Sequence, residues 1–287
     1  MSGGGVEVAE EQRGAGAEEI DRSLSSAPPR LCSSASSVTI AGIPVANLTE
    51  NETVAEIDRL IADQRPHYAA VVNAGKIVAA NQDERLKQIL LDADLVTADG
   101  MSVVWASRVL GQPLKQRVTG IDLFERLIAH AEQRGLSVYL LGAREESVRG
   151  VVEQFTKQYP SLQIAGYHNG YFTDSESQSL VESIRLSRAD LLFVAMGSPA
   201  QEYWIASNVG HTGVRFALGV GGSFDHVSGL ARRAPRWMQR IGFEWLYRFL
   251  REPRRMWRRY LIGNSLFILL IARQRIGHSR GDTTAIR

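Results

Sequence analysis

Short apolar runs recur along most of the chain, at intervals that suit alternating strands and helices. A first run, SVTIAGIPVANLT, spans residues 37–49. The later runs are YAAVV (68–72), LVTA (95–98), SVYLLG (137–142), LQIAGY (162–167), DLLFVAMG (190–197) and VRFALGVGG (214–222). Apolar runs of about four to eight residues, bounded by turn residues, are typical of buried strands.

Stretches with helical spacing of apolar residues lie between these runs. They cover residues 74–92, 101–111, 144–159, 175–187 and 199–210. Strand, helix and strand at this spacing predict an α/β fold, in which a mostly parallel sheet is covered by helices on both faces.

The chain divides into three predicted parts. Residues 1–37 mix Gly, Ser, Ala and Glu without periodicity, so we expect a disordered leader there. Residues 38–231 carry the strand and helix pattern, and residues 232–287 form a C-terminal appendage with a different composition. At 44% hydrophobic residues, the 287-residue chain can bury a sizeable core in one large domain.

Cysteine and histidine usage narrows the classes of site. The single cysteine, Cys32, excludes an intramolecular disulfide framework and a thiolate zinc site, and the six histidines are scattered. We expect no metal and a reducing, cytoplasmic setting. The sequence shows neither a signal-peptide pattern nor an apolar stretch of about 18 residues that would cross a bilayer.

Charge is distributed unevenly. Residues 232–287 carry a net charge of +11, and residues 1–231 carry −9. Arg251, Arg254, Arg255, Arg258 and Arg259 share helical spacing, so a helix that starts near Pro253 would place them on one face. Such asymmetry predicts an anionic partner at this end, either a membrane surface or a nucleic acid.

The apolar residues of the same region favour the membrane. Trp237, Trp245 and Trp257 fall here, together with the apolar run LFILLIA at 266–272. Arginine, tryptophan and apolar residues together are typical of a helix that lies in a membrane interface. The alternative is a solvated helix that packs its aromatic residues on the body. Nucleic-acid binding is less favoured, because the apolar run serves no phosphate backbone.

Polar residues and glycines follow the predicted strands where those strands end. They are Asn73, Asp99, Gly142, the segment Gly197 to Gln201, and GVGGSFD at 219–225. Ligands of parallel α/β sheets bind at this edge, so we expect these residues to line one crevice.

Each of these residues also has a purely structural interpretation. Asn73 and Asp99 would each cap the helix that follows, and Gln201 would close a capping box that begins at Ser198. The glycines of GVGG would serve a tight turn. The sequence has no G-x-G-x-x-G and no P-loop motif. Two aspartates at D-x-D spacing, Asp92 and Asp94, come before their predicted strand. They would therefore lie at the edge of the sheet opposite to the crevice.

Several ordered motifs carry a resemblance to a known family. They are NAGK at 73, ADGMSVVWASRVLG at 98, RVTGIDLFE at 117, GSPAQE at 197, GVGGSFD at 219, RRAPRW at 232 and GFEWLYRFLREPRRMWRRY at 242. In this order, over roughly residues 38–262, the chain resembles the WecG/TagA/CpsF family of bacterial glycosyltransferases.

The resemblance implies a fold and a reaction. It implies a Rossmann-like body with a C-terminal appendage that closes over the active site and touches the membrane. The reaction is an inverting, metal-independent transfer of a sugar from a UDP-sugar to a saccharide on undecaprenyl diphosphate, in cell-surface polysaccharide biosynthesis. The donor sugar would resemble N-acetylmannosamine, its uronic acid or glucuronic acid. The enzyme would need no cofactor, bind no nucleic acid and act peripherally at an anionic membrane, on the cytoplasmic face; oligomers are possible.

The resemblance also assigns residues. It makes Asp99 the base that takes the acceptor proton. It gives catalytic arginines at Arg248, Arg255 and Arg258, which would neutralise the leaving diphosphate. Substrate contacts are expected at Asn73, Gly100, Arg117, Gly197, Gln201, Gly219, Gly221, Gly222 and Asp225, the last of them near the nucleotide ribose.

The chain departs from the family pattern near its first site motif. Val71 stands where some members have threonine, and Gly75 stands where they often have glutamate. These departures leave the donor sugar open. Two other functions stay open at this point: a nucleotide-binding module without catalysis, and an Arg-rich protein that binds nucleic acid.

Overall fold

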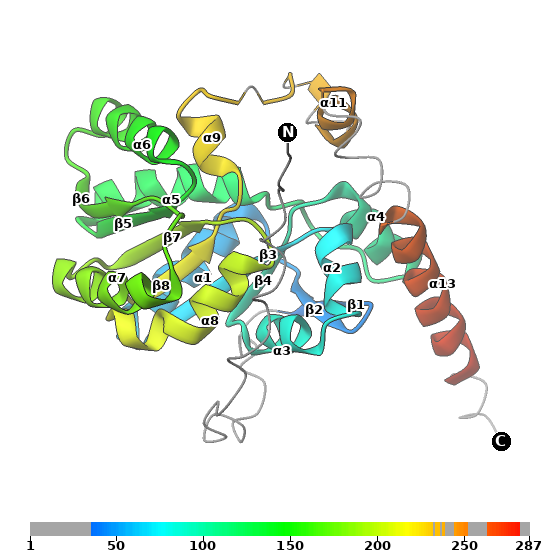
Figure 1. Ribbon diagram of the computed structural model, residues 1–287. Helices are drawn as coiled ribbons and strands as arrows, with labels where there is room; N and C mark the ends of the chain where they lie inside the picture. The colour runs from blue at the N-terminus through cyan, green and yellow to red at the C-terminus, as the bar shows by residue number, and fades with distance from the viewer. Residues whose placement is uncertain (1–35, 232, 236, 239–243, 252–262, 282–287) are drawn as a thin grey trace, which may run out of the picture.

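A six-stranded parallel sheet forms the centre of the molecule. The computed structural model describes residues 36–231, 233–235, 237–238, 244–251 and 263–281 (Figure 1). The strand order is β4-β3-β8-β7-β5-β6, and each neighbouring pair is parallel. The strands are β3 (His67–Val72), β4 (Leu95–Ala98), β5 (Ser137–Gly142), β6 (Gln163–His168), β7 (Leu191–Ala195) and β8 (Phe216–Gly219).

Helices cover both faces of this sheet. One face packs against α1 (Glu50–Ala62), α5 (Gly120–Arg134), α6 (Glu145–Gln158) and α9 (Ser223–Val227). The other packs against α2 (Ala74–Ala80), α3 (Glu84–Asp92), α4 (Met101–Val109), α7 (Asp174–Ser187) and α8 (Ala200–Thr212). The predicted α/β, Rossmann-like architecture is confirmed.

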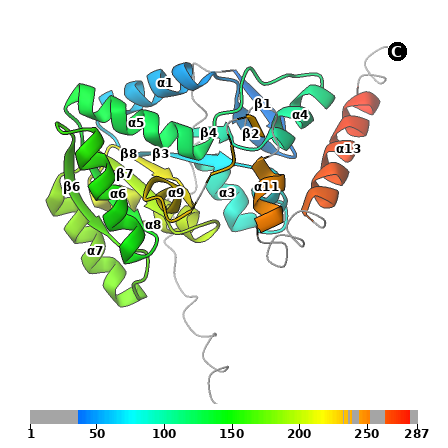
Figure 2. The same ribbon diagram turned by 90° about the horizontal axis from the view of Figure 1, so that it is seen from above.

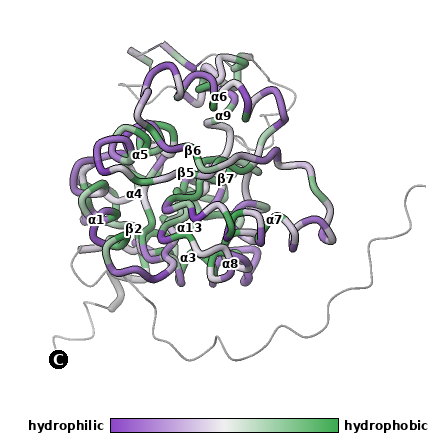
Figure 3. The backbone as a smooth tube through the Cα atoms, turned by 90° about the vertical axis from the view of Figure 1, so that its left-hand side faces the viewer, coloured by the Kyte–Doolittle hydropathy of each residue, from purple (hydrophilic) through white to green (hydrophobic). Residues whose placement is uncertain are grey.

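Successive side chains of the central strands enter apolar clusters on opposite faces of the sheet. Along β7, Leu191 and Phe193 belong to the apolar cluster on one face, and Leu192 and Val194 belong to a cluster on the other. Successive side chains of a strand point to opposite faces, so a strand with helices on both sides must be apolar throughout. Figure 3 shows the consequence: hydrophobic colour gathers along the central strands, and hydrophilic colour lies on the outer turns of the helices.

The first predicted strand segment lies outside the main sheet. Its residues form a two-stranded antiparallel hairpin, β1 (Ser37–Ile40) and β2 (Ile43–Ala46). Ala41 and Gly42 make the turn, both with positive φ. The hairpin buries Ile40, Ile43 and Val45 against α2, α3 and α4.

Several helices differ from the sequence expectation. The predicted helix 74–92 is two helices, α2 and α3, because Asp83 caps a new helix by accepting a hydrogen bond from the Leu86 N–H. Helices α1 and α5 were absent from the predicted series. The segment GVGGSFD runs into α9, which begins at Ser223 and was absent from the predicted series.

The C-terminal region contributes α11 (Glu244–Arg251) and α13 (Gly263–Gly281). Phe267 and Ile271 of α13 are buried in the same apolar cluster as α2 and the hairpin. Gln274 accepts a hydrogen bond from the Ala41 N–H at 2.7 Å and donates one to the Thr39 carbonyl at 2.7 Å. The predicted apolar run at 266–272 therefore packs partly on the body. No described helix is long and apolar enough to cross a membrane.

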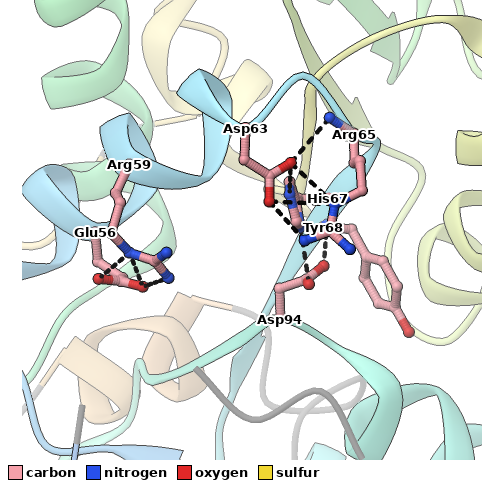
Figure 4. Close-up of polar contacts among 7 residues, drawn as sticks. All are labelled: Glu56, Arg59, Asp63, Arg65, His67, Tyr68 and Asp94. Atoms are coloured by element: carbon pink, nitrogen blue, oxygen red, sulfur yellow. Dashed lines mark hydrogen bonds and ion pairs between the residues drawn. The ribbon is translucent and has the colours of Figure 1, made fainter. Parts of the chain in front are cut away.

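A charged cluster stabilises the opposite, amino-terminal edge of the sheet (Figure 4). His67, at the start of β3, is buried, with Nδ1 at 2.8 Å from Asp94 and Nε2 at 3.0 Å from Asp63. The second contact is a close approach in which Nε2 makes no hydrogen bond. Hydrogen bonds from Arg65, and after them the close approach of the His67 imidazole, hold the pKa of Asp63 below its usual range. Asp94 thus serves the fold at the edge away from the predicted site, as its position before β4 indicated.

Candidate active site

The predicted site residues meet at the carboxyl edge of the sheet. Asn73 follows β3, Asp99 follows β4, and the glycine loop 219–222 follows β8, which pairs with β3. Helix α2 leaves β3 toward one face, and α9 leaves β8 toward the other. Neighbouring strands whose connections leave to opposite faces mark the point where open α/β sheets bind ligands. Helices α9 and α11 lie above this edge in Figure 1, and Figure 2 looks down on them.

Asp99 is held at this edge without capping the helix that follows it. Its backbone N–H donates to the Val72 carbonyl at 2.9 Å, which ties the end of β4 to β3. Its Oδ1 accepts a hydrogen bond from the Gly120 N–H, at 3.3 Å, at the start of α5. The N-cap of α4 is Gly100, which makes no side-chain cap bond. The capping interpretation of Asp99 is therefore wrong, and the half-buried carboxylate faces the first turn of α5 instead.

Asn73 is a helix cap, as the structural interpretation predicted. Its Oδ1 accepts a hydrogen bond from the Lys76 N–H at 3.1 Å. A Cβ atom placed on Gly100 would lie 3.4 Å from the Asn73 Cβ, so the ends of β3 and β4 bring these two residues into contact. The cap bond uses the amide oxygen of Asn73, and a contact of its Nδ2 group with a ligand remains a prediction.

Val71 lies just behind this pair. Its side chain is buried and would stand 3.6 Å from a Cβ at Gly120. The residue that departs from the family pattern therefore packs on the same glycine that donates to Asp99. Gly75, the other departure, lies in the first turn of α2.

Gln201 is hydrogen-bonded to the glycine loop 219–222. It is 2% exposed, and its Oε1 accepts a hydrogen bond from the Gly221 N–H at 2.9 Å. A Cβ on Gly219 would lie 2.5 Å from Nε2 of Gln201, so a larger residue there would displace the Gln201 side chain. Gly221 has φ +56°, a conformation that glycine adopts without strain. The predicted capping box is wrong: α8 has no side-chain cap bond, and Gln201 bonds to another loop.

A buried ion pair that the sequence analysis missed lies beside Gln201. Nζ of Lys76 is 2.6 Å from Oε1 of Glu202, and the same oxygen accepts a hydrogen bond from Gln201 Nε2 at 2.9 Å. Both charged side chains are about 5% exposed. The only sequence signal was a lysine and a glutamate inside two site motifs, NAGK and GSPAQE.

Asp225 and Gly197 lie at neighbouring strand ends. Asp225, in α9, accepts a hydrogen bond from the Ser147 hydroxyl of α6 at 2.6 Å. Gly197 has φ +76°, and its carbonyl accepts from the Gln201 N–H at 2.9 Å. Both residues are half-buried, and their contact with a nucleotide remains a prediction.

Arg117 links the site to the C-terminal region. The Val118 N–H donates to the Ala98 carbonyl at 2.9 Å, which places Arg117 beside the end of β4. Its guanidinium lies 3.8 Å from Glu244, the first residue of α11. Arg233 lies 3.5 Å from the same glutamate and donates two hydrogen bonds to Asp122 of α5, at 2.6 and 3.1 Å.

Burial alone would raise the pKa of Asp122, yet the hydrogen bonds from Arg233 and Thr119 hold it below its usual value. Asp122 is therefore a charged anchor for Arg233. Through Arg233 and Glu244, that anchor joins α11 to the first turn of α5.

Of the three catalytic arginines implied by the resemblance, only the backbone of Arg248 lies in a described element. It belongs to α11, four residues after Glu244. The side chain of Arg248 and the whole of Arg255 and Arg258 lie outside the described residues, as do the start of the helix predicted near Pro253 and residues 1–35.

Two other features bear on the choice of site. A hollow of about 370 Å³ lies beside α1, but its lining includes none of the predicted residues. Its cation, Lys115, is already paired with Glu52 at 2.8 Å. Among the described residues, no group of three His, Cys, Asp or Glu side chains is placed to hold a metal ion.

Comparison with known proteins identifies the family. Residues 38–281 match the glycosyl transferase WecG/TagA/CpsF family. A relative from Bacillus spizizenii is 38% identical over 63% of this chain and 70% of its own length. One from Bacillus subtilis is 34% identical over 78% and 86%, and one from Staphylococcus aureus is 31% identical over 85% and 96%. All three are named N-acetylglucosaminyldiphosphoundecaprenol N-acetyl-beta-D-mannosaminyltransferase. The chain belongs to the WecG/TagA/CpsF family of glycosyltransferases.

Proposed function

We propose that this enzyme transfers a sugar from a UDP-sugar to a saccharide carried on undecaprenyl diphosphate, with inversion at the anomeric carbon and without a metal ion. The names of the relatives support the acceptor class, and they make N-acetylmannosamine the first donor sugar to test. Membership of a transferase family favours catalysis over the nucleotide-binding module and the nucleic-acid binder.

The position of Asp99 carries the proposal. Asp99 follows β4 and Asn73 follows the neighbouring strand β3; the Asp99 side chain is half-buried, and Gly120 donates to one of its oxygens. In an inverting transfer, the acceptor hydroxyl gives its proton to this carboxylate while its oxygen bonds to the anomeric carbon. The bond from that carbon to the diphosphate oxygen breaks on the far side, and UDP leaves. A positioned base of this kind contributes roughly 10² to 10⁴ in rate.

The leaving diphosphate needs cations and N–H donors on the opposite side. The glycine loop 219–222 follows β8, and we assign its backbone to the diphosphate. Arg117 beside β4 and the predicted arginines Arg248, Arg255 and Arg258 would supply positive charge. The contact of Glu244 with Arg117 supports an α11 that lies near this site.

We further propose a location on the cytoplasmic face of the membrane, and the surface of α13 supports contact with lipid. Ile268, Leu269 and Ile276 are between 46% and 67% exposed, on a helix whose other side is buried. Residues 232–287 carry a net charge of +11. Exposed apolar residues combined with positive charge are typical of peripheral binding to anionic lipid.

A donor panel tests the reaction. Wild-type protein is incubated with an N-acetylglucosaminyl lipid diphosphate and, in turn, UDP-N-acetylmannosamine, its uronic acid and UDP-glucuronic acid, with and without EDTA. We expect UDP release with one of these donors, unaffected by EDTA, and a product whose anomeric configuration is opposite to that of the donor. Retention of configuration, loss of activity in EDTA, or no turnover with any donor would contradict the proposal.

A salt titration of DNA and RNA binding tests the alternative that this protein binds nucleic acid. A nucleic-acid binder would bind DNA or RNA with an affinity that falls steeply as salt rises, whereas we expect no such binding.

A further inference from the structure

Four polar groups form a continuous chain beneath the carboxyl edge of the sheet. Lys76 of α2 is joined to Glu202 of α8 at 2.6 Å, and Gln201 donates to the same Glu202 oxygen at 2.9 Å. The amide oxygen of Gln201 then accepts from the Gly221 N–H at 2.9 Å. The chain thus runs from the helix after β3 to the loop after β8.

Only one arrangement of donors and acceptors satisfies this chain. The ammonium of Lys76 and the N–H of Gly221 can only donate, and an ionised Glu202 can only accept. The amide of Gln201 must therefore turn its nitrogen to Glu202 and its oxygen to Gly221. If the amide were reversed, its NH₂ group would face the Gly221 N–H, and its oxygen would face a carboxylate.

Because the three side chains are buried, reversing the Gln201 amide would be costly. Lys76, Glu202 and Gln201 are 7%, 4% and 2% exposed. In such surroundings hydrogen bonds are strengthened, and a mismatched buried polar group is costly. Glu202 Oε2 is buried and has no hydrogen-bond partner among the described residues. A pair that leaves one carboxylate oxygen unsatisfied is a poor device for stability alone, because buried pairs are often no better than apolar replacements.

We propose that Lys76 and Glu202 are positioning residues that fix the amide of Gln201 and, through it, the conformation of the glycine loop that binds the diphosphate of the donor. This inference rests on the proposed function, which assigns the loop to the diphosphate. Neither residue touches the substrate. Lys76 also donates its backbone N–H to the Asn73 side chain, so one residue of α2 contacts both the Asn73 amide and the chain that reaches the loop.

The decisive variant removes both charges together. Lys76→Met alone would leave Glu202 as an uncompensated buried charge and lower stability for that reason. Lys76→Met/Glu202→Leu leaves no buried charge, so we expect a folded protein. Gln201 then has no acceptor for its nitrogen, and its amide is free to turn. We expect UDP affinity and kcat/KM for the donor to fall about tenfold, which is equivalent to about 1.4 kcal/mol.

Two further variants distinguish positioning from a general effect on folding. Glu202→Gln keeps an oxygen that can accept from Gln201 and Lys76, so UDP affinity should stay within about threefold of wild type. In a Gln201→Met background, the double change should add nothing, because residues that act through one another are not additive. Arg185→Met/Glu182→Leu removes an exposed pair on α7 and serves as the matched control.

The readouts are UDP binding by calorimetry, donor kinetics, and amide hydrogen exchange at Gly221 without ligand. We expect exchange at Gly221 to rise about tenfold in the double variant, while the control matches wild type. A folded double variant with wild-type exchange and wild-type UDP affinity would overturn the inference, as would a full additional loss in the Gln201→Met background. A double variant that fails to fold, together with a Glu202→Gln variant that loses as much UDP affinity as Gln201→Met, would also overturn it. If wild-type protein bound no UDP, the proposed function would fail, yet exchange at Gly221 would still report on the chain that reaches the loop.

Discussion

Replacement of Phe267 by alanine tests whether α13 is an integral part of the folded body. Phe267 is 4% exposed and belongs to the apolar cluster that α2 and the β1–β2 hairpin share. Phenylalanine to alanine changes in cores cost about 3 to 5 kcal/mol. Because α13 packs by one side only, we expect the lower end, about 3 kcal/mol. The midpoint of thermal unfolding should fall by roughly 6 to 12 °C.

Local undocking of α13 limits how much global stability Phe267→Ala can remove. Besides Phe267, α13 is held by Ile271 and by the two hydrogen bonds of Gln274. If these contacts break before the sheet unfolds, the helix opens as a unit of its own. The loss would then appear as faster amide exchange within residues 263–281, with a smaller change in global stability.

The assay combines urea unfolding, followed by circular dichroism, with hydrogen exchange. The matched control is Ile268→Ala, because Ile268 is the next residue along the same helix and is 67% exposed. We expect the control to stay within about 0.5 kcal/mol of wild type. Equal effects of the two variants on stability and on exchange in α13 would refute the packing of this helix on the body.

Three further predictions concern charge and surface. Because its folded-state pKa is lowered, Asp63 stabilises the fold above the ordinary aspartate pKa of about 3.9, and this contribution is lost as the pH falls toward the folded value. Thermal scans should therefore show Asp63→Asn less stable than wild type at pH 7, with a difference that shrinks below about pH 4. Ile268→Ser/Ile276→Ser should reduce cosedimentation with anionic liposomes about tenfold without a change in melting temperature; equal sedimentation would argue against α13 as a lipid contact. Glu244→Gln weakens the ion pairs with Arg117 and Arg233, so amide exchange in residues 244–251 should rise about fivefold, which corresponds to about 1 kcal/mol; unchanged exchange would mean that other contacts hold α11.

The sequence was sufficient to predict the sheet and the edge at which the site residues gather. Buried parallel strands are short apolar runs, and the residue after each run must lie at the carboxyl edge. Asn73, Asp99 and the glycine loop could be placed there for this reason. Helices α1 and α5 were absent from the predicted series, although each follows a threonine that caps it, Thr49 and Thr119.

The sequence could not predict which residues the site residues contact. Asp99 suits a cap of α4 by local rules, but the pairing of Val118 with Ala98 brings Gly120 to its carboxylate. Lys76 and Glu202 are 126 residues apart, and no local pattern indicates that they pair. The same holds for α13. Its apolar run predicts that some of its residues are buried, but only the tertiary contacts show which residues face the body.

The most direct test of the account is the turnover of Asp99→Asn, measured beside Asp92→Asn. Asp92 is an exposed carboxylate seven residues earlier, so its variant controls for the loss of one negative charge. With the donor that the wild type uses, we predict that kcat of Asp99→Asn falls by roughly 10² to 10⁴ while its UDP affinity is unchanged. The Asp92→Asn control should turn over like wild type. If Asp99→Asn turned over as fast as the control, Asp99 would not be the base, and the proposed mechanism would be wrong.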